Sequence, residues 1–119
     1  MSTINESMTD LMTLDGALCA AIVDSSSGMM LGSAGSGVDL DVAAAGNTEV
    51  VRAKLKTMKA LKLKDVIEDI LITLGKQYHL IRPLVQKEGI FVYYVLDKNK
   101  SNLALARRKL QDIEKEIDF

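Results

Sequence analysis

The chain of 119 residues is poor in the side chains that usually carry chemistry or cross-links. It contains one cysteine, one histidine, one proline and no tryptophan, and aromatic residues make up only 4% of it. A single cysteine can form neither an internal disulfide nor a zinc site. A single histidine leaves an imidazole-based catalytic site poorly supplied with partners for proton transfer. We therefore expect no catalytic residue, no metal site and no cofactor.

Long hydrophobic runs and an excess of one charge are lacking too. No apolar run approaches the roughly 20 residues of a membrane span, and the start, MSTINESMTD, lacks the basic and apolar stretches of a signal peptide. Lys and Arg total 15 and Asp and Glu total 16, a formal net charge of −1. An electrostatic nucleic-acid binder needs clustered cations instead. We expect a soluble cytoplasmic protein, with neither nucleic-acid binding nor membrane insertion.

The sequence does have a large apolar share, 48% of its residues. The length fits one domain, residues 1–119, which buries roughly two-thirds of its unfolded surface. Near the start, a capping box of Thr3 and Glu6 predicts a helix over residues 4–14. Two strands follow near 17–24 and 28–34, on either side of a Ser/Gly cluster. Both strands are almost continuously apolar, so we expect both of their faces to be covered.

A helix of about twenty residues is predicted from Leu40 onward. Three strands joined by tight turns follow between residues 66 and 97, and the last of them, IFVYYVL, is apolar on both faces and therefore central. An amphipathic helix closes the chain after Asp97. The order α-ββ-α-βββ-α predicts an α+β fold in which an antiparallel sheet carries helices on its faces.

The long helix has two apolar stripes. The bulky one suits packing on the sheet and contains Leu40, Ala44, Val51, Leu55 and Met58, with Leu61 beside them. The other contains small or β-branched residues: Val42, Gly46, Ala53 and Ala60. A helix-interior glycine costs about 1 kcal/mol relative to alanine, so close approach of a neighbouring helix is an expected compensation at Gly46.

Each candidate for chemistry has a simpler structural explanation. The segment from Gly32 to Gly37 lies where a phosphate loop would be, but Val38-Asp39-Leu40-Asp41 replaces the Lys-Ser/Thr pair and would repel phosphate. We interpret it as a strand-to-helix connection. His79 has no nearby acid or cysteine in the sequence, although Asp69 could come from an adjoining strand. We interpret this histidine as part of the sheet.

The remaining candidates are also favoured as structural. Cys19 lies in an apolar run and is expected to be a buried thiol. Ser25 to Ser27 are expected to form a hairpin turn. Arg82 could be offered to a phosphate in trans, but its place in a strand beside Pro83 gives no support for the exposure or mobility that this role needs. The basic stretch is interpreted as a solvated helix face and, second, as a patch for an acidic protein partner; it comprises Arg52, Lys54, Lys56, Lys59, Lys62 and Lys64.

The whole pattern resembles the roadblock domain. The resemblance is carried by the order of elements, by the hairpin ALCAAIVDSSSGMMLGSAG, by ILITLG at Ile70 to Gly75, and by the apolar strand followed by Asp97 and LALAR. It implies a three-layer, profilin-like fold with five antiparallel strands in the order 2-1-5-4-3. The long helix is then expected on one face and the terminal helices on the other.

Members of this family usually form dimers through the third strand and the long helix. The resemblance thus implies a homodimer whose interface contains Val42, Gly46, Ala53, Ala60, Ile70, Leu71, Ile72 and Leu74. An exposed apolar edge strand is a hazard unless it is paired, which agrees with this expectation. Bacterial members also imply a partner, a small Ras-like GTPase, which the dimer would bind as a scaffold or regulator without its own catalytic residue. A small-molecule-sensing module and, below it, a small enzyme using His79 or Cys19 remain the alternatives.

Overall fold

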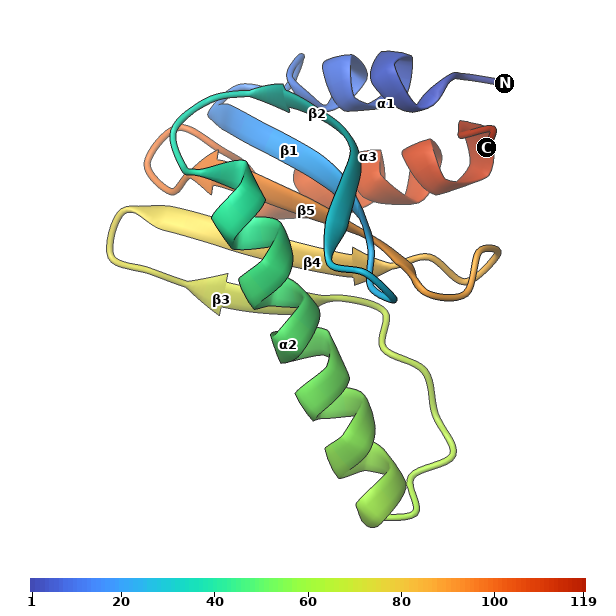
Figure 1. Cartoon of the computed structure of the whole chain (residues 1–119). Helices are drawn as coiled ribbons and strands as arrows, with labels where there is room; N and C mark the ends of the chain where they lie inside the picture. The colour runs from blue at the N-terminus through green and yellow to red at the C-terminus, as the bar shows by residue number, and fades with distance from the viewer.

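The computed structural model describes all 119 residues, as three helices and one five-stranded antiparallel sheet. The elements are α1 (Ile4–Leu11), β1 (Ala17–Asp24), β2 (Met29–Gly35), α2 (Leu40–Ala60), β3 (Ile70–Thr73), β4 (Gln77–Pro83), β5 (Ile90–Asp97) and α3 (Leu103–Glu116). The sheet order, β2-β1-β5-β4-β3, and the order of elements along the chain are those predicted (Figure 1).

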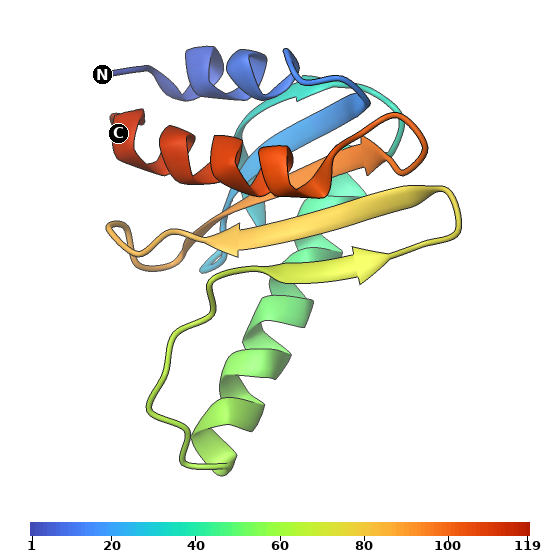
Figure 2. The ribbon, with the colours of Figure 1, turned by 180° about the vertical axis from the view of Figure 1, so that it is seen from behind.

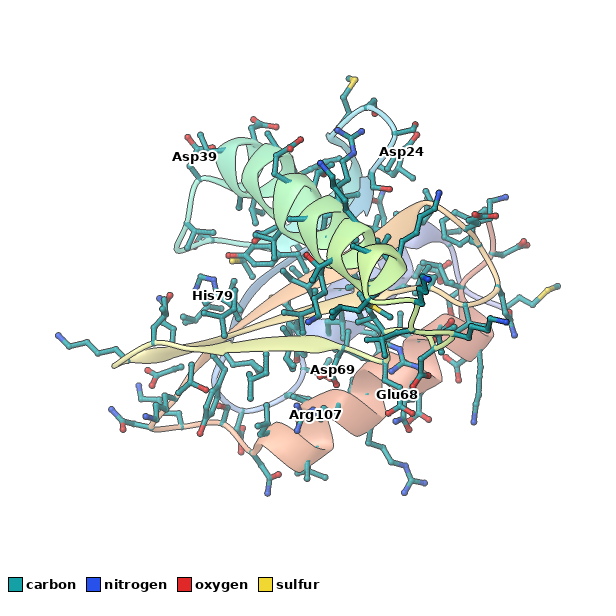
Figure 3. The ribbon with its side chains drawn as sticks, turned by 90° about the horizontal axis from the view of Figure 1, so that it is seen from below. Asp24, Asp39, Glu68, Asp69, His79 and Arg107 are labelled. Carbon is teal, nitrogen blue, oxygen red and sulfur yellow. The ribbon has the colours of Figure 1, made fainter.

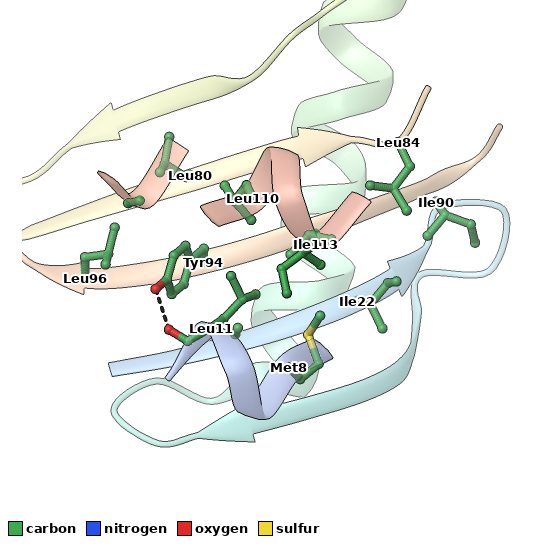
Figure 4. Packing of buried hydrophobic residues seen from close by; sticks show 13 residues of the cluster. Met8, Leu11, Ile22, Leu80, Leu84, Ile90, Tyr94, Leu96, Leu110 and Ile113 are labelled. Carbon is green, nitrogen blue, oxygen red and sulfur yellow. Dashed lines mark hydrogen bonds between the residues drawn. The ribbon is translucent and has the colours of Figure 1, made fainter. Parts of the chain in front are cut away.

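Helices cover the two faces of the sheet unequally. α1 and α3 lie side by side on one face, and α2 crosses the other face alone (Figures 1 and 2). On the face with two helices, Leu80 and Tyr94 of the sheet pack with Leu11 and Leu110 (Figure 4). The Tyr94 hydroxyl donates a hydrogen bond to the Leu11 carbonyl, so the polar end of this buried side chain is satisfied. On the α2 face, a smaller core includes Ala44.

β5 is the central strand, as its sequence predicts. Every residue from Ile90 to Leu96 is buried, because β1 and β4 flank the strand and helices lie on both of its faces. Both apolar faces of IFVYYVL are therefore buried. Tyr94 packs in the core under α1 and α3, and Tyr93 packs in the core under α2.

Two expectations about local structure are wrong. β2 has one exposed face rather than two covered ones, and Met29 and Leu31 on that face are 68% and 44% exposed. Exposed and partly buried residues alternate along β2, and a bulge opposite Ile22 and Val23 shifts its register with β1. The first helix ends at Leu11 rather than at residue 14, because the Thr13 hydroxyl and backbone N–H both donate to the Asp10 carbonyl and close a turn there.

α2 is longer than the sheet is wide, so its second half projects beyond β3 (Figure 1). This overhang corrects the expectation that the whole bulky stripe packs on the sheet. Val51 and Met58 are buried, whereas Leu55 and Leu61 are 50% and 61% exposed. A residue in the left-handed conformation, Lys62 with φ of 58°, then ends the helix.

The two ends of the chain meet beside α1 and α3. Ser2 and Ile117 form a parallel β-bridge, and both termini lie on the side away from the end of α2 (Figures 1 and 2). No helix combines the length and the apolar character needed to cross a membrane.

Candidate functional site

The glycine-rich segment serves packing rather than phosphate binding. Most of it lies inside β2, not in a loop. A Cβ at Gly32 would overlap the Ile4 side chain, and one at Gly35, where φ is +80°, would overlap the Leu18 carbonyl. At the start of α2, the Asp39 carboxylate already accepts from the Val42 N–H at 3.2 Å, which leaves that donor unavailable to an anion.

His79 is held in a polar chain on the α2 side of the sheet (Figure 3). The Tyr93 hydroxyl lies 2.8 Å from Nδ1, and Nε2 lies 2.8 Å from Oε1 of Gln77. A neutral imidazole with its proton on Nε2 satisfies both contacts, because Tyr93 then donates and Gln77 accepts. Burial lowers the pKa of His79 and raises the pKa of Tyr93 to about 12, so both groups stay neutral at pH 7. No carboxylate hydrogen-bonds to the ring, and the expectation that Asp69 could approach it is wrong.

Cys19 and the serine cluster have the structural roles predicted for them. Cys19 is fully buried on the α2 face of β1, and burial raises the pKa of its thiol. Ser26 donates to the Asp24 carboxylate through both its hydroxyl and its backbone N–H, and these bonds lower the pKa of Asp24. Ser25 reaches the next turn, where its hydroxyl donates to the Gly89 carbonyl at 2.7 Å. The bonds to Asp24 stabilise the hairpin turn between β1 and β2, and the bond to Gly89 attaches this turn to the one between β4 and β5.

Arg82 points into the protein rather than toward a partner. Its guanidinium forms an ion pair with Glu114 at 2.8 Å, and the two side chains are only 14% and 8% exposed. The second carboxylate oxygen of Glu114 accepts from the Val85 N–H at 2.6 Å. The same guanidinium donates to the Glu68 carbonyl at 3.3 Å. Arg82 therefore joins α3 to β4 and to the segment before β3.

A second ion pair that the sequence did not indicate fixes the start of β3. Arg107 on α3 donates to both carboxylate oxygens of Asp69, at 2.9 and 3.1 Å (Figure 3). The charges lie 38 residues apart, beyond any helical or hairpin spacing, so no local signal could have revealed the pair. The Arg107–Asp69 pair thus attaches the start of β3 to α3, and the hydrogen bond from Arg82 to the Glu68 carbonyl attaches the preceding residue to β4.

The structure leaves two adjoining surfaces exposed around β3 and α2. β3 is an outer strand with no neighbour beyond it; Ile72 and the following Leu74 are 36% and 43% exposed, whereas Ile70 and Leu71 are half-buried. The small stripe of α2 lies opposite the residues that face the sheet, and all four of its residues are exposed: Val42, Gly46, Ala53 and Ala60. The predicted interface residues thus form two patches in different orientations, one along the sheet edge and one on top of the helix.

A hollow of about 370 Å³ lies between α2, the segment before β3 and the turn between β4 and β5. Its lining is mostly apolar and includes Val51, Leu55 and Phe91. No buried polar side chain without a partner points into it, since Ser7 Oγ, on α1, is the only such atom in the chain. The hollow therefore shows no built polar site for a small molecule. Across the whole chain, no three His, Cys, Asp or Glu side chains come together as a metal site requires.

Comparison with solved structures identifies the fold. The chain is similar to a roadblock/LC7 domain from Streptomyces avermitilis, with a TM-score of 0.82, 12% identity, and coverage of 96% of this chain and 93% of that one. It is also similar to MglB of Myxococcus xanthus, with a TM-score of 0.76, 16% identity and coverage of 95% and 86%. A further MglB structure, in a tetrameric arrangement, is similar with a TM-score of 0.79 and 16% identity. The match covers 92% of this chain and 81% of that one.

No family model and no curated protein matches the sequence. The identities to the solved structures are low, so these similarities establish the fold and not the activity. The chain has the roadblock/LC7 fold, as its pattern of elements predicted.

The buried ion pair predicts a structural effect for Arg82. Replacing Arg82→Met leaves the Glu114 carboxylate buried and unpaired, so we expect the free energy of unfolding to fall by about 3 kcal/mol. Urea denaturation measures this change. Arg108→Met, at an exposed position on α3, the helix that carries Glu114, is the control and should stay within about 0.5 kcal/mol of the wild type. Unchanged stability in Arg82→Met would contradict the role assigned to the ion pair.

His79 predicts a pH dependence of stability. Because burial lowers its pKa in the folded protein, the unfolded chain takes up the proton first as the pH falls through about 6.5. The free energy of unfolding should therefore fall below neutral pH and stop falling from this cause below the folded pKa. Urea denaturation between pH 7.5 and 5.5 should show a smaller change for His79→Gln, since the chain has no other histidine. Equal slopes for the two proteins would refute the assignment.

Proposed function

We propose that the protein is a homodimeric, non-catalytic regulatory scaffold that binds and modulates a small Ras-like GTPase in the cytoplasm. The main argument for a dimer is the exposed edge of strand β3. A strand edge with exposed apolar side chains and unpaired backbone groups is a template for pairing with another strand. A second copy of the chain, related by a two-fold axis, would present the same edge in return.

β3 is a better pairing edge than β2, the other outer strand. β2 contains a bulge and two glycines that are fixed by close packing, and such features twist an edge away from regular pairing. β3 is short but regular: its four residues pair with β4 in an unbroken register from Ile70 to Thr73. Its position is also fixed, because Asp69, immediately before it, is bonded to α3.

The interface that we propose has two parts. Along β3 it contains Ile70, Leu71 and Ile72, continuing to Leu74. On α2 it contains the exposed small residues Val42, Gly46, Ala53 and Ala60. No atom lies within 4 Å of a Cβ built at Gly46, so the open surface there can admit a close neighbour. The tetrameric arrangement of one MglB neighbour supports self-association of this fold.

The GTPase assignment comes from the resemblance to bacterial roadblock proteins, among which the MglB neighbours are regulators. The chemistry of the chain is compatible with regulation through shape. His79, Cys19 and Arg82 are all engaged inside the fold, so none is presented to a substrate or a phosphate. A partner is therefore expected to keep its own catalytic groups and to be influenced by contact with the dimer surface.

The dimer is tested by the mass of the protein in solution. Sedimentation equilibrium in the micromolar range should give about 26 kDa, twice the 13.0 kDa of one chain. Ile72→Lys on β3 should give monomers, because it places a charge in the strand pairing. Leu31→Lys is the matched control on the opposite edge strand, with a similar initial exposure of 44% against 36%, and should remain dimeric. Monomeric wild-type protein would refute the dimer.

GTPase binding is tested with small Ras-like GTPases from the same genome. Each is loaded with GDP or with a non-hydrolysable GTP analogue and passed over the immobilised protein. We expect retention that depends on the nucleotide, and a changed rate of GTP hydrolysis when the protein is added in solution. Neither retention nor a change in hydrolysis for any candidate would refute this part of the proposal while leaving the dimer intact.

A further inference from the structure

Positive charge is concentrated in one part of the chain. Residues 50–64, the second half of α2 and the residues that follow it, contain no acidic residue. They contribute a charge of +6, so the rest of the chain carries −7 within a net charge of −1. The six basic residues are Arg52, Lys54, Lys56, Lys59, Lys62 and Lys64.

These lysines have no internal role as charges. All five are exposed, and none takes part in an ion pair within the chain. Only Arg52 is engaged, with Glu49 and with the carbonyl groups of Ser25 and Ser26. The lysine side chains therefore remain available to an anionic surface outside the molecule.

The basic segment also projects away from most of the protein, and the nearest acidic residue in the sequence, Asp65, directly follows it. α2 passes beyond β3, and the chain turns back only after the helix has ended (Figure 1). The eight residue steps from Arg52 to Ala60 extend about 12 Å along the helix axis. This length exceeds the Debye length of about 8 Å at physiological ionic strength. An anionic surface can thus attract the end of α2 while repulsion from acidic residues on the α1 and α3 side of the protein is largely screened. Asp65, which follows the tip, offsets one of its positive charges.

Exposed leucines lie among the lysines at this projecting end. Leu61 and Leu63 are 61% and 52% exposed and alternate with Lys62 and Lys64. Their backbone is fixed: the Lys62 N–H donates to the Lys59 carbonyl and the Leu63 N–H donates to the Met58 carbonyl, which together form a Schellman cap. Leucines and lysines are therefore presented together on a defined turn.

We propose that this projecting tip, residues 59–64, is a peripheral binding site for an anionic lipid surface. Lysines attract the negatively charged headgroups, and leucines at the same point can enter the boundary between headgroups and acyl chains. A protein partner would need a cavity matched to this protrusion, whereas a lipid surface deforms around it. Single-stranded nucleic acid is disfavoured because no aromatic residue occurs in residues 38–77 to stack on bases.

The proposed lipid site shares one residue, Ala60, with the proposed dimer interface, and its test requires neither the dimer nor the GTPase. The last α2 residue of the proposed dimer interface is Ala60, so most of the tip lies beyond it. Binding through the tip requires no membrane-spanning segment. It would bring the protein to the membrane surface by reversible, salt-dependent adsorption.

The test is co-sedimentation of the whole protein with vesicles. Vesicles of phosphatidylcholine alone are compared with vesicles containing about one quarter phosphatidylglycerol. We expect binding only to the anionic vesicles, and release when NaCl is raised from about 0.05 M to about 0.5 M. Each lysine near an anionic surface is worth about five-fold in affinity, so the triple variant Lys59→Glu, Lys62→Glu and Lys64→Glu should bind at least about 100-fold more weakly.

Matched variants distinguish the effect of the tip on binding from the effect of the protein's net charge. Lys76→Glu, Lys100→Glu and Lys115→Glu change the net charge equally at exposed positions elsewhere and should retain binding. Leu61→Ser should weaken binding about five-fold without altering its salt dependence. Circular dichroism confirms that each variant folds.

Three outcomes would overturn the proposal. The first is equal binding to both kinds of vesicle. The second is equal loss in the two triple variants, which would assign binding to net charge. The third is displacement by duplex DNA at an equal concentration of charge, which would assign the tip to polyanions in general.

Discussion

The fold depends on burying β5 on both faces at once. A strand in the middle of a sheet covered on both sides must be apolar throughout, and it needs a neighbour along each edge to satisfy its backbone. β1 and β4 provide the edges, and the helices provide the two covers. The other strands are less covered the farther they lie from β5. The outermost strands, β2 and β3, are the least covered, and β3 has the most regular exposed edge.

The few polar side chains inside the protein serve to hold this arrangement. Tyr94 reaches a carbonyl of α1, Tyr93 reaches His79, and the Arg82–Glu114 pair fixes α3 against β4. From the sequence alone, polar side chains such as His79 and Arg82 could be mistaken for catalytic or ligand-binding groups. In the structure each has its partners within the same chain. The surfaces left for function are therefore defined by exposed apolar residues and by the distribution of charge, rather than by reactive groups.

The sequence predicts most of this fold, because its strongest signals are local. The Thr3–Glu6 capping box, the turn residues between strands and the doubly apolar strand β5 each depend on residues close together in the chain. The sheet order came from the resemblance to roadblock domains. What could not be predicted depends on distance in three dimensions: the pairing of Arg107 with Asp69, the exposed face of β2, and the overhang that exposes Leu55. Periodicity shows that a residue is apolar on one helix face, but not whether the sheet extends far enough to cover it.

The bridge between Ser2 and Ile117 brings the two ends of the chain together next to α1 and α3. These two helices form one layer although they are the first and last elements of the sequence. The integrity of that layer depends on contact rather than on covalent order. A circularly permuted chain, with the old ends joined by a short linker and new ends at an exposed turn, would keep the same layers. Any segment attached at residue 1 or residue 119 would emerge from the α1–α3 side and leave the opposite side, with α2, uncovered.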